Sequence, residues 1–337
     1  MRRHVLAGLA SALLLLPQSS LAQENEFFAG KTIRFVLAFA PGQAYDIWAR
    51  LMARHFPKHI PGRPVFVVEN MPGAGGITAT NWLYSRAPRD GTVWGMVNHN
   101  VADQALSKVA NVTYDPARLI FLGTPEVTNR ACFVVGQSPV KTAHDLFKHQ
   151  VVVGGTGAGS PVTQSPRLLK NMLGMNVKLV EGYKSPQDVI LAMERGELEG
   201  VCQTIQSFMG ARPGWLESGR ARIFISFDRE PPAGVDAPTV YDFVKSEDDR
   251  KVLRYYSASG ELGRPIALPP EVPSDRVNML RRAFDATMKD PEFVTEVTKS
   301  GYLVTPRSGE QLQQIILEEM QTSPETIART AALTQGD

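Results

Sequence analysis

Short apolar, β-branched runs alternate with segments of helical periodicity along most of this chain, and no other feature constrains the fold as strongly. Between the first two runs, Ile47, Leu51 and Phe56 form an apolar stripe at helical spacing. Strands that alternate with helices predict an α/β fold whose mostly parallel sheets are covered by helices. The apolar runs lie at 33–39, 65–68, 93–97, 132–135, 151–153, 177–180 and 223–227.

The last third of the chain is predicted to be helical. Amphipathic runs cover residues 274–288, 291–300 and 308–333. Ser308 and Gln311 have the spacing of a capping box, which places the start of the last run at Ser308.

The first 22 residues have the pattern of a secretory signal. Arg2 and Arg3 precede an apolar run over residues 5–16, and the small residues Ser20 and Ala22 fit a cleavage site. The run is shorter than the roughly 20 apolar residues that a membrane helix needs. We therefore expect cleavage near Ala22 and export of the mature protein to the periplasm.

The charge of the chain argues against nucleic acid as a partner. The full sequence has 36 Lys and Arg residues against 34 Asp and Glu residues, and without Arg2 and Arg3 both counts are 34. No extended basic run is present that would follow a phosphate backbone.

The two cysteines, Cys132 and Cys202, both lie in apolar stretches. Neither is near the expected cleavage site, and no CxxC motif or Cys/His cluster predicts a metal site. A disulfide needs Cα atoms within about 7 Å, which the sequence spacing cannot establish. We expect buried free thiols, with a disulfide as the alternative.

Two glycine-containing loops connect a predicted strand to a predicted helix, the first at residues 39–46 and the second at residues 154–161. The first four N–H groups of a helix lack internal partners, and the helix dipole adds about half a positive charge there. Such a junction can bind an anion, although plain structural connections are the alternative for each loop alone. Two of these loops facing one another across a cleft would hold an anion between them.

In their order and spacing these loops and several further motifs resemble the receptors of tripartite tricarboxylate transporters, also called Bug proteins. The resemblance extends over essentially the whole mature chain. It implies a periplasmic solute-binding protein, which is not an enzyme and needs no cofactor. The further motifs are residues 68–76 (VENMPGAGG), 88–91 (PRDG), 183–185 (YKS) and 236–240 (DAPTV).

The resemblance also implies the two-lobed α/β fold of type II periplasmic binding proteins, with the ligand cleft between the lobes. One lobe is expected to comprise residues 23–125 and 228–337, and the other residues 126–227. The lobes would close about a hinge over a small organic anion, usually a carboxylate. Membrane subunits of the transporter would then recognise the closed form. We expect the receptor to be a monomer.

Positions that match the family motifs give the expected ligand-binding residues. Glycines there allow a ligand to approach the backbone, and hydroxyl groups can donate hydrogen bonds. Asp46 is expected to shape its loop or to contact a hydroxyl or amine, and not to bind a carboxylate, because it would repel an anion. No catalytic residue or metal ligand is expected. The expected ligand-binding residues are Pro41, Gly42, Gln43, Ala44, Tyr45, Asp46, Asn98, His99, Thr156, Gly157, Ala158, Gly159, Ser160 and Tyr183.

Three positions depart from the family pattern. The family commonly has glycine at Gln43, histidine at Thr163 and aspartate at Gln203. The amide of Gln43 and the ring of Tyr45 favour a ligand with a ring or an extra polar group over a plain dicarboxylate.

Two enzymatic functions are the alternatives. A nucleotide-dependent enzyme would use residues 155–159 as a dinucleotide-binding turn and Glu181 to bind a ribose, but Ser160 occupies the last glycine position of that motif. A secreted hydrolase would use Ser160 or Thr156 as its nucleophile. No base is indicated for it, and the Gly-x-Ser-x-Gly motif is absent.

Overall fold

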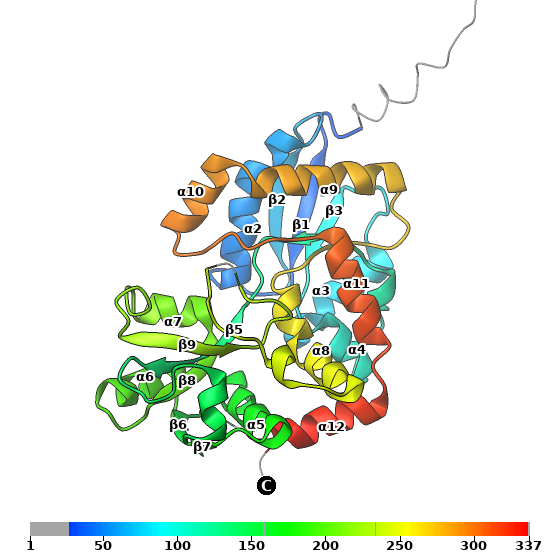
Figure 1. Ribbon diagram of the computed structural model, residues 1–337. Helices are drawn as coiled ribbons and strands as arrows, with labels where there is room; N and C mark the ends of the chain where they lie inside the picture. Colours follow the sequence, from blue (N-terminus) through cyan, green and yellow to red (C-terminus); the bar gives the residue numbers. More distant parts are fainter. Residues whose placement is uncertain (1–26, 158, 233, 336–337) are drawn as a thin grey trace, which may run out of the picture.

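The computed structural model describes residues 27–157, 159–232 and 234–335. The expected export signal, residues 1–22, lies outside the described residues, as does Ala158. The described chain forms two α/β lobes, each built around one sheet (Figure 1). None of the helices in the described part of the chain is long and apolar enough to cross a membrane.

The first sheet has six strands in the order β11-β4-β10-β3-β1-β2. Its strands are β1 (Thr32–Leu37), β2 (Val65–Asn70), β3 (Val93–Met96), β4 (Ile120–Thr124), β10 (Ile266–Leu268) and β11 (Arg307–Ser308). One face packs against α2 (Ala44–His55), α9 (Ser274–Met288) and α10 (Pro291–Lys299). The other face packs against α3 (Ile77–Arg86), α4 (Val101–Leu106) and α11 (Gly309–Met320).

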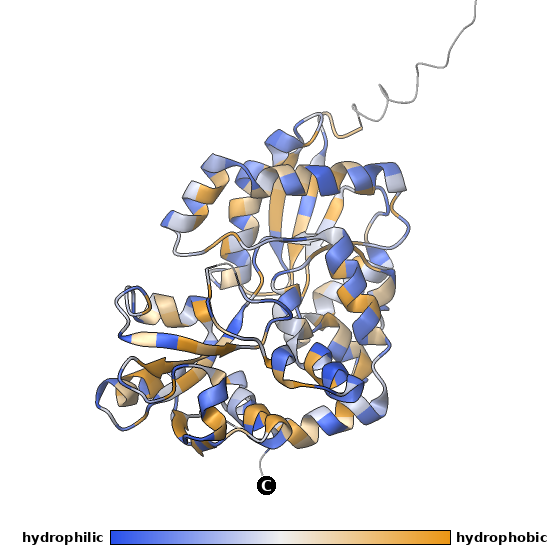
Figure 2. Ribbon diagram, in the orientation of Figure 1, coloured by the Kyte–Doolittle hydropathy of each residue, from blue (hydrophilic) through white to orange (hydrophobic). Residues whose placement is uncertain are grey.

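Strand β1 shows why this sheet is buried on both faces. Phe35 and Leu37 point into one core, while Val36 and Ala38 point into the other. Because successive side chains of a strand alternate between faces, a continuous apolar run requires helices on both sides. Figure 2 shows largely apolar strands and helices that are apolar on one side only.

The second sheet has five strands in the order β7-β6-β8-β5-β9. Its strands are β5 (Arg130–Val135), β6 (Val151–Gly154), β7 (Val177–Val180), β8 (Gly200–Thr204) and β9 (Ala221–Ser226). One face packs against α5 (Pro161–Leu173) and part of α8 (Glu247–Leu262). The other face packs against α6 (Pro186–Glu194) and α7 (Ile205–Ala211).

Both sheets are mixed, so the prediction of mostly parallel sheets is wrong. Strand β5 runs antiparallel to both of its neighbours, β8 and β9, and β10 runs antiparallel to both β3 and β4. Strand β5 follows the segment that leaves the first sheet, and β10 follows the segment that returns to it. Each of these strands comes from the other lobe, and each runs antiparallel to its neighbours in the sheet that it joins.

Two C-terminal helices connect the lobes. Helix α8 places Val252 and Leu253 in the core of the second sheet, and Ala258 and Leu262 in a core of the first. Helix α12 (Pro324–Thr334) packs against α5 and α8 (Figure 1). The lobe boundaries near residues 125 and 228 stay a prediction.

The predicted helical run over 308–333 is wrong in its continuity. Helix α11 ends at Met320, and α12 begins at Pro324 with the hydroxyl of Ser323 accepting a hydrogen bond from the N–H of Thr326. Proline lacks an N–H group and is favoured at the first position of a helix, so Pro324 starts a new helix. The capping box of Ser308 and Gln311 is confirmed.

Cys132 and Cys202 form a disulfide bond, so the expectation of free thiols is wrong. The two residues are directly opposite one another on the antiparallel strands β5 and β8, and both are fully buried. Their pairing depends on the register of two strands that lie 70 residues apart in sequence. The bond fixes the middle of the second sheet.

Candidate ligand-binding site

The loop at residues 39–46 joins β1 to α2 and is closed by the carboxylate of Asp46. This group accepts hydrogen bonds from the N–H of Gly42 at 2.9 Å and from Asn70 Nδ2 at 3.0 Å, and it pairs with Arg50 at 2.9 Å. The hydrogen bond from Arg50, helped by those from Gly42 and Asn70 and opposed by burial, lowers the pKa of Asp46 to about 2. The prediction that Asp46 shapes its loop is confirmed.

The side chain of Tyr45 ties the same loop to the chain that returns to the first sheet. Its hydroxyl donates to the carbonyl oxygen of Gly263 at 3.1 Å and lies 3.0 Å from Nδ1 of His99. The same hydroxyl accepts a hydrogen bond from the backbone N–H of His99 at 3.3 Å, and the tautomer of His99 decides which group donates in the Nδ1 contact. The Tyr45 hydroxyl therefore connects the first loop to both His99 and Gly263.

The outer part of the loop is open to solvent. Pro41, Gly42 and Gln43 are exposed, and Ala44 is half-buried. Gly42 has a φ of +81°, a conformation that residues other than glycine rarely adopt. This glycine is therefore required by the backbone of the turn.

Asn98 and His99 follow the end of β3. The amide of Asn98 donates to the carbonyl oxygen of Gly75 at 2.6 Å and accepts from the N–H of Asn100 at 2.9 Å, so its side chain holds two neighbouring segments in place. Burial, together with the positive charges of Arg130 and Arg264, lowers the pKa of His99 to about 4. At neutral pH the imidazole is uncharged.

The second glycine loop joins β6 to α5. Thr156 is buried, and the hydroxyl of Ser160 accepts a hydrogen bond from the N–H of Val162 as the N-cap of α5. The N–H of Tyr183 donates to the carbonyl oxygen of Gly155 at 3.3 Å, which places Tyr183 beside this loop. Ala158, also expected to bind ligand, lies outside the described residues.

Gly157 and Gly159 have no evident role in the fold itself. Both are exposed, neither has a positive φ, and a Cβ atom added to either would meet nothing within 4 Å. Gly155 differs, because a Cβ there would lie 2.9 Å from both Leu179 and Thr163. Packing therefore explains Gly155, whereas Gly157 and Gly159 leave accessible backbone at the start of α5.

A groove of about 620 Å³ between α4, α5, α8 and α12 brings two of the expected residues together. His99 comes from the first lobe and Gly159 from the second. Tyr255 and Tyr256 of α8 form part of its wall. Within the described residues, the other expected ligand-binding positions lie outside the lining of this groove.

Arg130, the first residue of β5, also lines the groove and was missed by the sequence reasoning. Its guanidinium carbon lies 5.2 Å from the centre of the Tyr256 ring. The Tyr256 hydroxyl is in turn 2.7 Å from the hydroxyl of Ser165. A charged residue directly before the apolar stretch that begins at Ala131 was the available signal.

The sequence-family comparison now decides between the possible classes of protein. The family described as tripartite tricarboxylate transporter family receptor, TctC, matches residues 49–331. The chain belongs to this family. The resemblance of its motifs to these receptors is thereby confirmed, and the family consists of solute-binding receptors and not of enzymes.

Individual relatives of this TctC receptor agree with the assignment. A UPF0065 protein from Cupriavidus necator is 25% identical over 246 residues, which cover 69% of this chain and 71% of that protein. A TctC solute-binding protein from Polaromonas, solved without ligand, has a TM-score of 0.69 at 15% identity and covers 89% of this chain and 98% of its own. Rpa4515 from R. palustris, solved with adipate, has a TM-score of 0.50 at 18% identity, with coverages of 90% and 97%. These structures show that the two-lobed fold is shared.

The contacts of this TctC receptor do not favour the enzymatic alternatives. Glu181, the acid that a ribose would need, pairs with Arg167 at 2.6 Å. The hydroxyl of Ser160 is engaged as a helix cap. Glu181 is thus part of an ion pair and Ser160 is part of a helix cap, and both contacts are structural roles.

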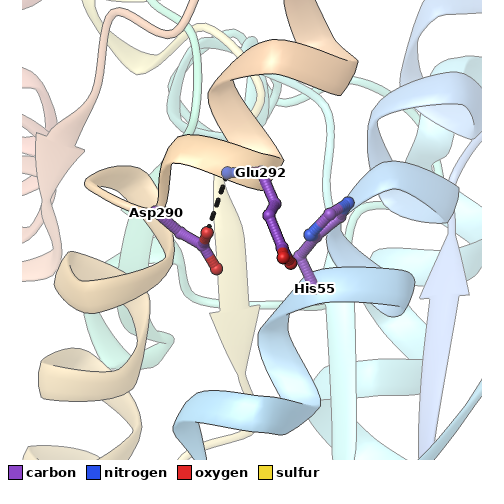
Figure 3. Close-up of side chains that lie close together, drawn as sticks. All are labelled: His55, Asp290 and Glu292. Atoms are coloured by element: carbon purple, nitrogen blue, oxygen red, sulfur yellow. Dashed lines mark hydrogen bonds between the residues drawn. The ribbon is translucent and has the colours of Figure 1, made fainter.

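A separate cluster of His55, Asp290 and Glu292 has the composition of a metal site (Figure 3). The ammonium group of Lys58 forms ion pairs with both Asp290 and Glu292. Burial raises the pKa of Asp290, but hydrogen bonds from Lys58 and His59 outweigh it and hold the pKa well below its usual range. In this receptor the cluster is therefore an ion-pair network that joins α10 to the end of α2.

Proposed function

We propose that this receptor binds a small organic anion carrying at least one carboxylate between its two lobes and delivers it to membrane subunits of a tripartite transporter. The expected residues of both lobes would contact the ligand, and neither catalysis nor a cofactor is needed. Family membership supports the receptor role. Rpa4515, which shares the fold, was solved with adipate, a dicarboxylate.

The accessible backbone at Gly157 and Gly159 carries the carboxylate part of the proposal. Neither residue needs to be glycine for its φ angle or for packing. A ligand that approaches the main chain at the start of α5 would explain why both residues are glycine. At the start of α5 the N–H of Val162 is capped by Ser160 and Pro161 has no N–H, so it is the helix dipole that favours a negatively charged group there over a neutral one.

Closure of the lobes would bring the first loop toward this helix start. Tyr45 connects the first loop to Gly263, which lies where the chain returns from α8 to the first sheet. Bending at such connecting segments moves two lobes as rigid bodies. The ligand would stabilise the closed form because only that form offers contacts from both lobes.

The disulfide supports a location outside the cytoplasm. Disulfide bonds form and persist in oxidising compartments such as the bacterial periplasm. The Cys132–Cys202 bond fits the export signal expected at residues 1–22. We accordingly place the receptor in the periplasm.

Thermal unfolding of the purified receptor with candidate ligands tests the proposal. The protein is first unfolded and refolded to remove any ligand, and then mixed with succinate, L-malate, adipate, citrate, benzoate and phenylacetate, and with their amides. A ligand at 100 times its Kd stabilises the folded state by about 2.7 kcal/mol, which raises the Tm visibly. Stabilisation by one or more acids and not by the matching amides is expected. Equal shifts with acid and amide, or no shift at all, would overturn the proposal.

A further inference from the structure

The guanidinium group of Arg130 lines the groove, and no described residue forms an ion pair with it. Within the described residues, its side chain makes no hydrogen bond or ion pair, and its Nε atom is buried without a partner. A buried donor without an acceptor costs free energy comparable to a lost hydrogen bond, and more when the group is charged. A hydrogen-bond acceptor that entered the groove and paired with Arg130 would therefore be stabilising.

Other half-buried arginines near the lobe junction are paired, which makes Arg130 different. Arg264 pairs with the buried Glu126 at 2.5 Å. Arg229 pairs with the buried Glu261 at 2.9 Å. Those two cations thus have an acid in direct contact, whereas Arg130 forms no ion pair within the described residues, and the nearby Asp228 interacts with its charge only at longer range.

The acids near the groove accept a hydrogen bond from another residue or have a pKa raised by burial, and none of them in the described part of the chain forms an ion pair with Arg130. Asp228 accepts a hydrogen bond from Asn129 at 3.0 Å, and burial raises its pKa to about 7. Asp103 accepts a hydrogen bond from the hydroxyl of Tyr255. Burial, with the nearby charge of Asp103, raises the pKa of Glu319 to about 8.

The position of Arg130 is fixed from both ends. Its backbone pairs with Thr204 of β8, and its carbonyl oxygen accepts from the N–H of Phe227. At the other end, the guanidinium lies against the Tyr256 ring, which Ser165 holds through the tyrosine hydroxyl. A cation held in this way needs little reorganisation to bind an anion.

We propose that Arg130 binds the carboxylate of the ligand, through the planar fork of its guanidinium, in the groove between His99 and Gly159. The inference rests on the proposed function and names the side chain that binds the acid group. Arginine suits this role because two parallel N–H groups match the two oxygens of a carboxylate.

The same groove indicates the class of acid. Tyr255, Tyr256, Ile327 and Ala331 contribute aromatic and apolar surface to its wall. A cavity of about 620 Å³ lies in the range of pockets that hold drug-sized ligands. Most of the other lining side chains are polar, so the ligand is a carboxylate larger than a four-carbon diacid that has both apolar and polar parts.

Calorimetric titration of the full receptor and three variants tests this assignment. The variants are Arg130→Gln, Arg130→Lys and, as a matched control on the exposed face of α9, Arg282→Gln. The probes are phenylacetate and adipate, with phenylacetamide and the diamide adipamide as their neutral partners, and succinate as the short diacid. Near-UV circular dichroism and urea unfolding show whether each variant is folded.

In the wild type we expect at least one long acid to bind more tightly than its amide and more tightly than succinate. Arg130→Gln should weaken binding of that acid roughly 10- to 100-fold and remove the preference over the amide. Arg130→Lys should give an intermediate loss, because lysine keeps the charge but not the fork. Arg282→Gln should bind as the wild type does.

An Arg130→Gln variant that folds and still prefers the acid as the wild type does would overturn the role of Arg130 and leave the proposed function standing. If Arg130→Gln does not fold, an unchanged acid preference in Arg130→Lys has the same meaning. Tighter binding of succinate than of the long acids would overturn the assigned ligand class. A wild type that binds none of the acids would overturn the proposed function together with this inference.

Discussion

The hydroxyl of Tyr45 lies 3.0 Å from Nδ1 of His99 and also donates a hydrogen bond to the carbonyl oxygen of Gly263. One buried oxygen thus joins the first glycine loop, the end of β3 and the segment that returns from α8. Burial raises the pKa of Tyr45 to about 12, so the hydroxyl keeps its proton at any physiological pH. The loop proposed to contact the ligand is therefore coupled to the connection between the lobes.

Replacing Tyr45 with phenylalanine removes only this hydroxyl and should destabilise the receptor. The carbonyl oxygen of Gly263 and Nδ1 of His99 lose their partner while they stay largely buried. Leaving such groups unsatisfied costs about 1–3 kcal/mol in the free energy of unfolding, which urea denaturation measures. Ligand affinity should fall as well, because the loop loses its anchor.

Tyr302→Phe is the matched control. Tyr302 packs against Trp48 in the same lobe, and its hydroxyl makes no hydrogen bond within the described residues. Its removal should change the free energy of unfolding by no more than about 0.5 kcal/mol. Equal effects of the two substitutions would show that the Tyr45 contacts contribute nothing.

The sequence pattern predicted the elements that depend on local residues. Strands β1, β2, β6 and β7 were recognised because each contains a short run dominated by apolar, mostly β-branched residues. The short strands β10 and β11 were not, because three residues and two residues carry no periodicity of their own. Their place in the first sheet depends on where the chain returns from the other lobe, which only tertiary packing decides.

In the candidate site, too, some features follow from local sequence and others depend on tertiary packing. The local role of Asp46 followed from its place in the first turn of a helix, and the hydrogen bond from Gly42 confirms it. The disulfide required the register of β5 against β8, and the groove contact of Arg130 required the packing of α8 on the second sheet. Neither relationship is encoded within a short stretch of sequence.

The pKa of His99 makes the stability of the receptor depend on pH. It is lowered to about 4 in the folded protein, against about 6.5 in the unfolded chain. As the pH falls from 6.5 to 4, the unfolded chain binds a proton that the folded protein does not. The contribution of His99 is therefore fully present above pH 6.5 and is lost toward pH 4, with a total of roughly 3 kcal/mol.

Asp228 and Glu319 give the stability the opposite dependence on pH. The stability of the wild type as a function of pH therefore does not isolate the contribution of His99. Their pKa values are raised by burial, and their contributions to stability are therefore lost as the pH rises. The comparison of wild type with His99→Asn removes this background. The wild type should lose stability relative to the variant between pH 7.5 and pH 4.5 in urea denaturation. A constant difference across that range would contradict the prediction.

Breaking the Cys132–Cys202 bond should destabilise the second lobe. The bond closes a loop of about 70 residues, and loops of this length give about 2–4 kcal/mol of stabilisation. Urea denaturation with and without a reductant, and of the Cys132→Ala/Cys202→Ala variant, measures the loss. Reductant should leave the double variant unchanged, and an oxidised wild type no more stable than the reduced form would contradict the pairing.

Alanine at Gly157 or Gly159 should separate ligand binding from folding. Neither position has a positive φ or a close neighbour, so alanine fits the folded backbone and reduces the freedom of the unfolded chain. The free energy of unfolding should stay the same or rise by about 0.4–1 kcal/mol. The added methyl group would stand where the ligand approaches the backbone, so affinity for the bound acid should fall at least about tenfold, a loss of about 1.4 kcal/mol.

Gly210→Ala in α7 is the control for this last prediction. Gly210 likewise has no positive φ, and a Cβ atom added there would meet nothing within 4 Å. This substitution should also preserve or raise stability, but it should leave ligand affinity unchanged. If all three variants bind the acid as the wild type does, the ligand does not approach the backbone at the start of α5. The glycines of the second loop would then need another explanation.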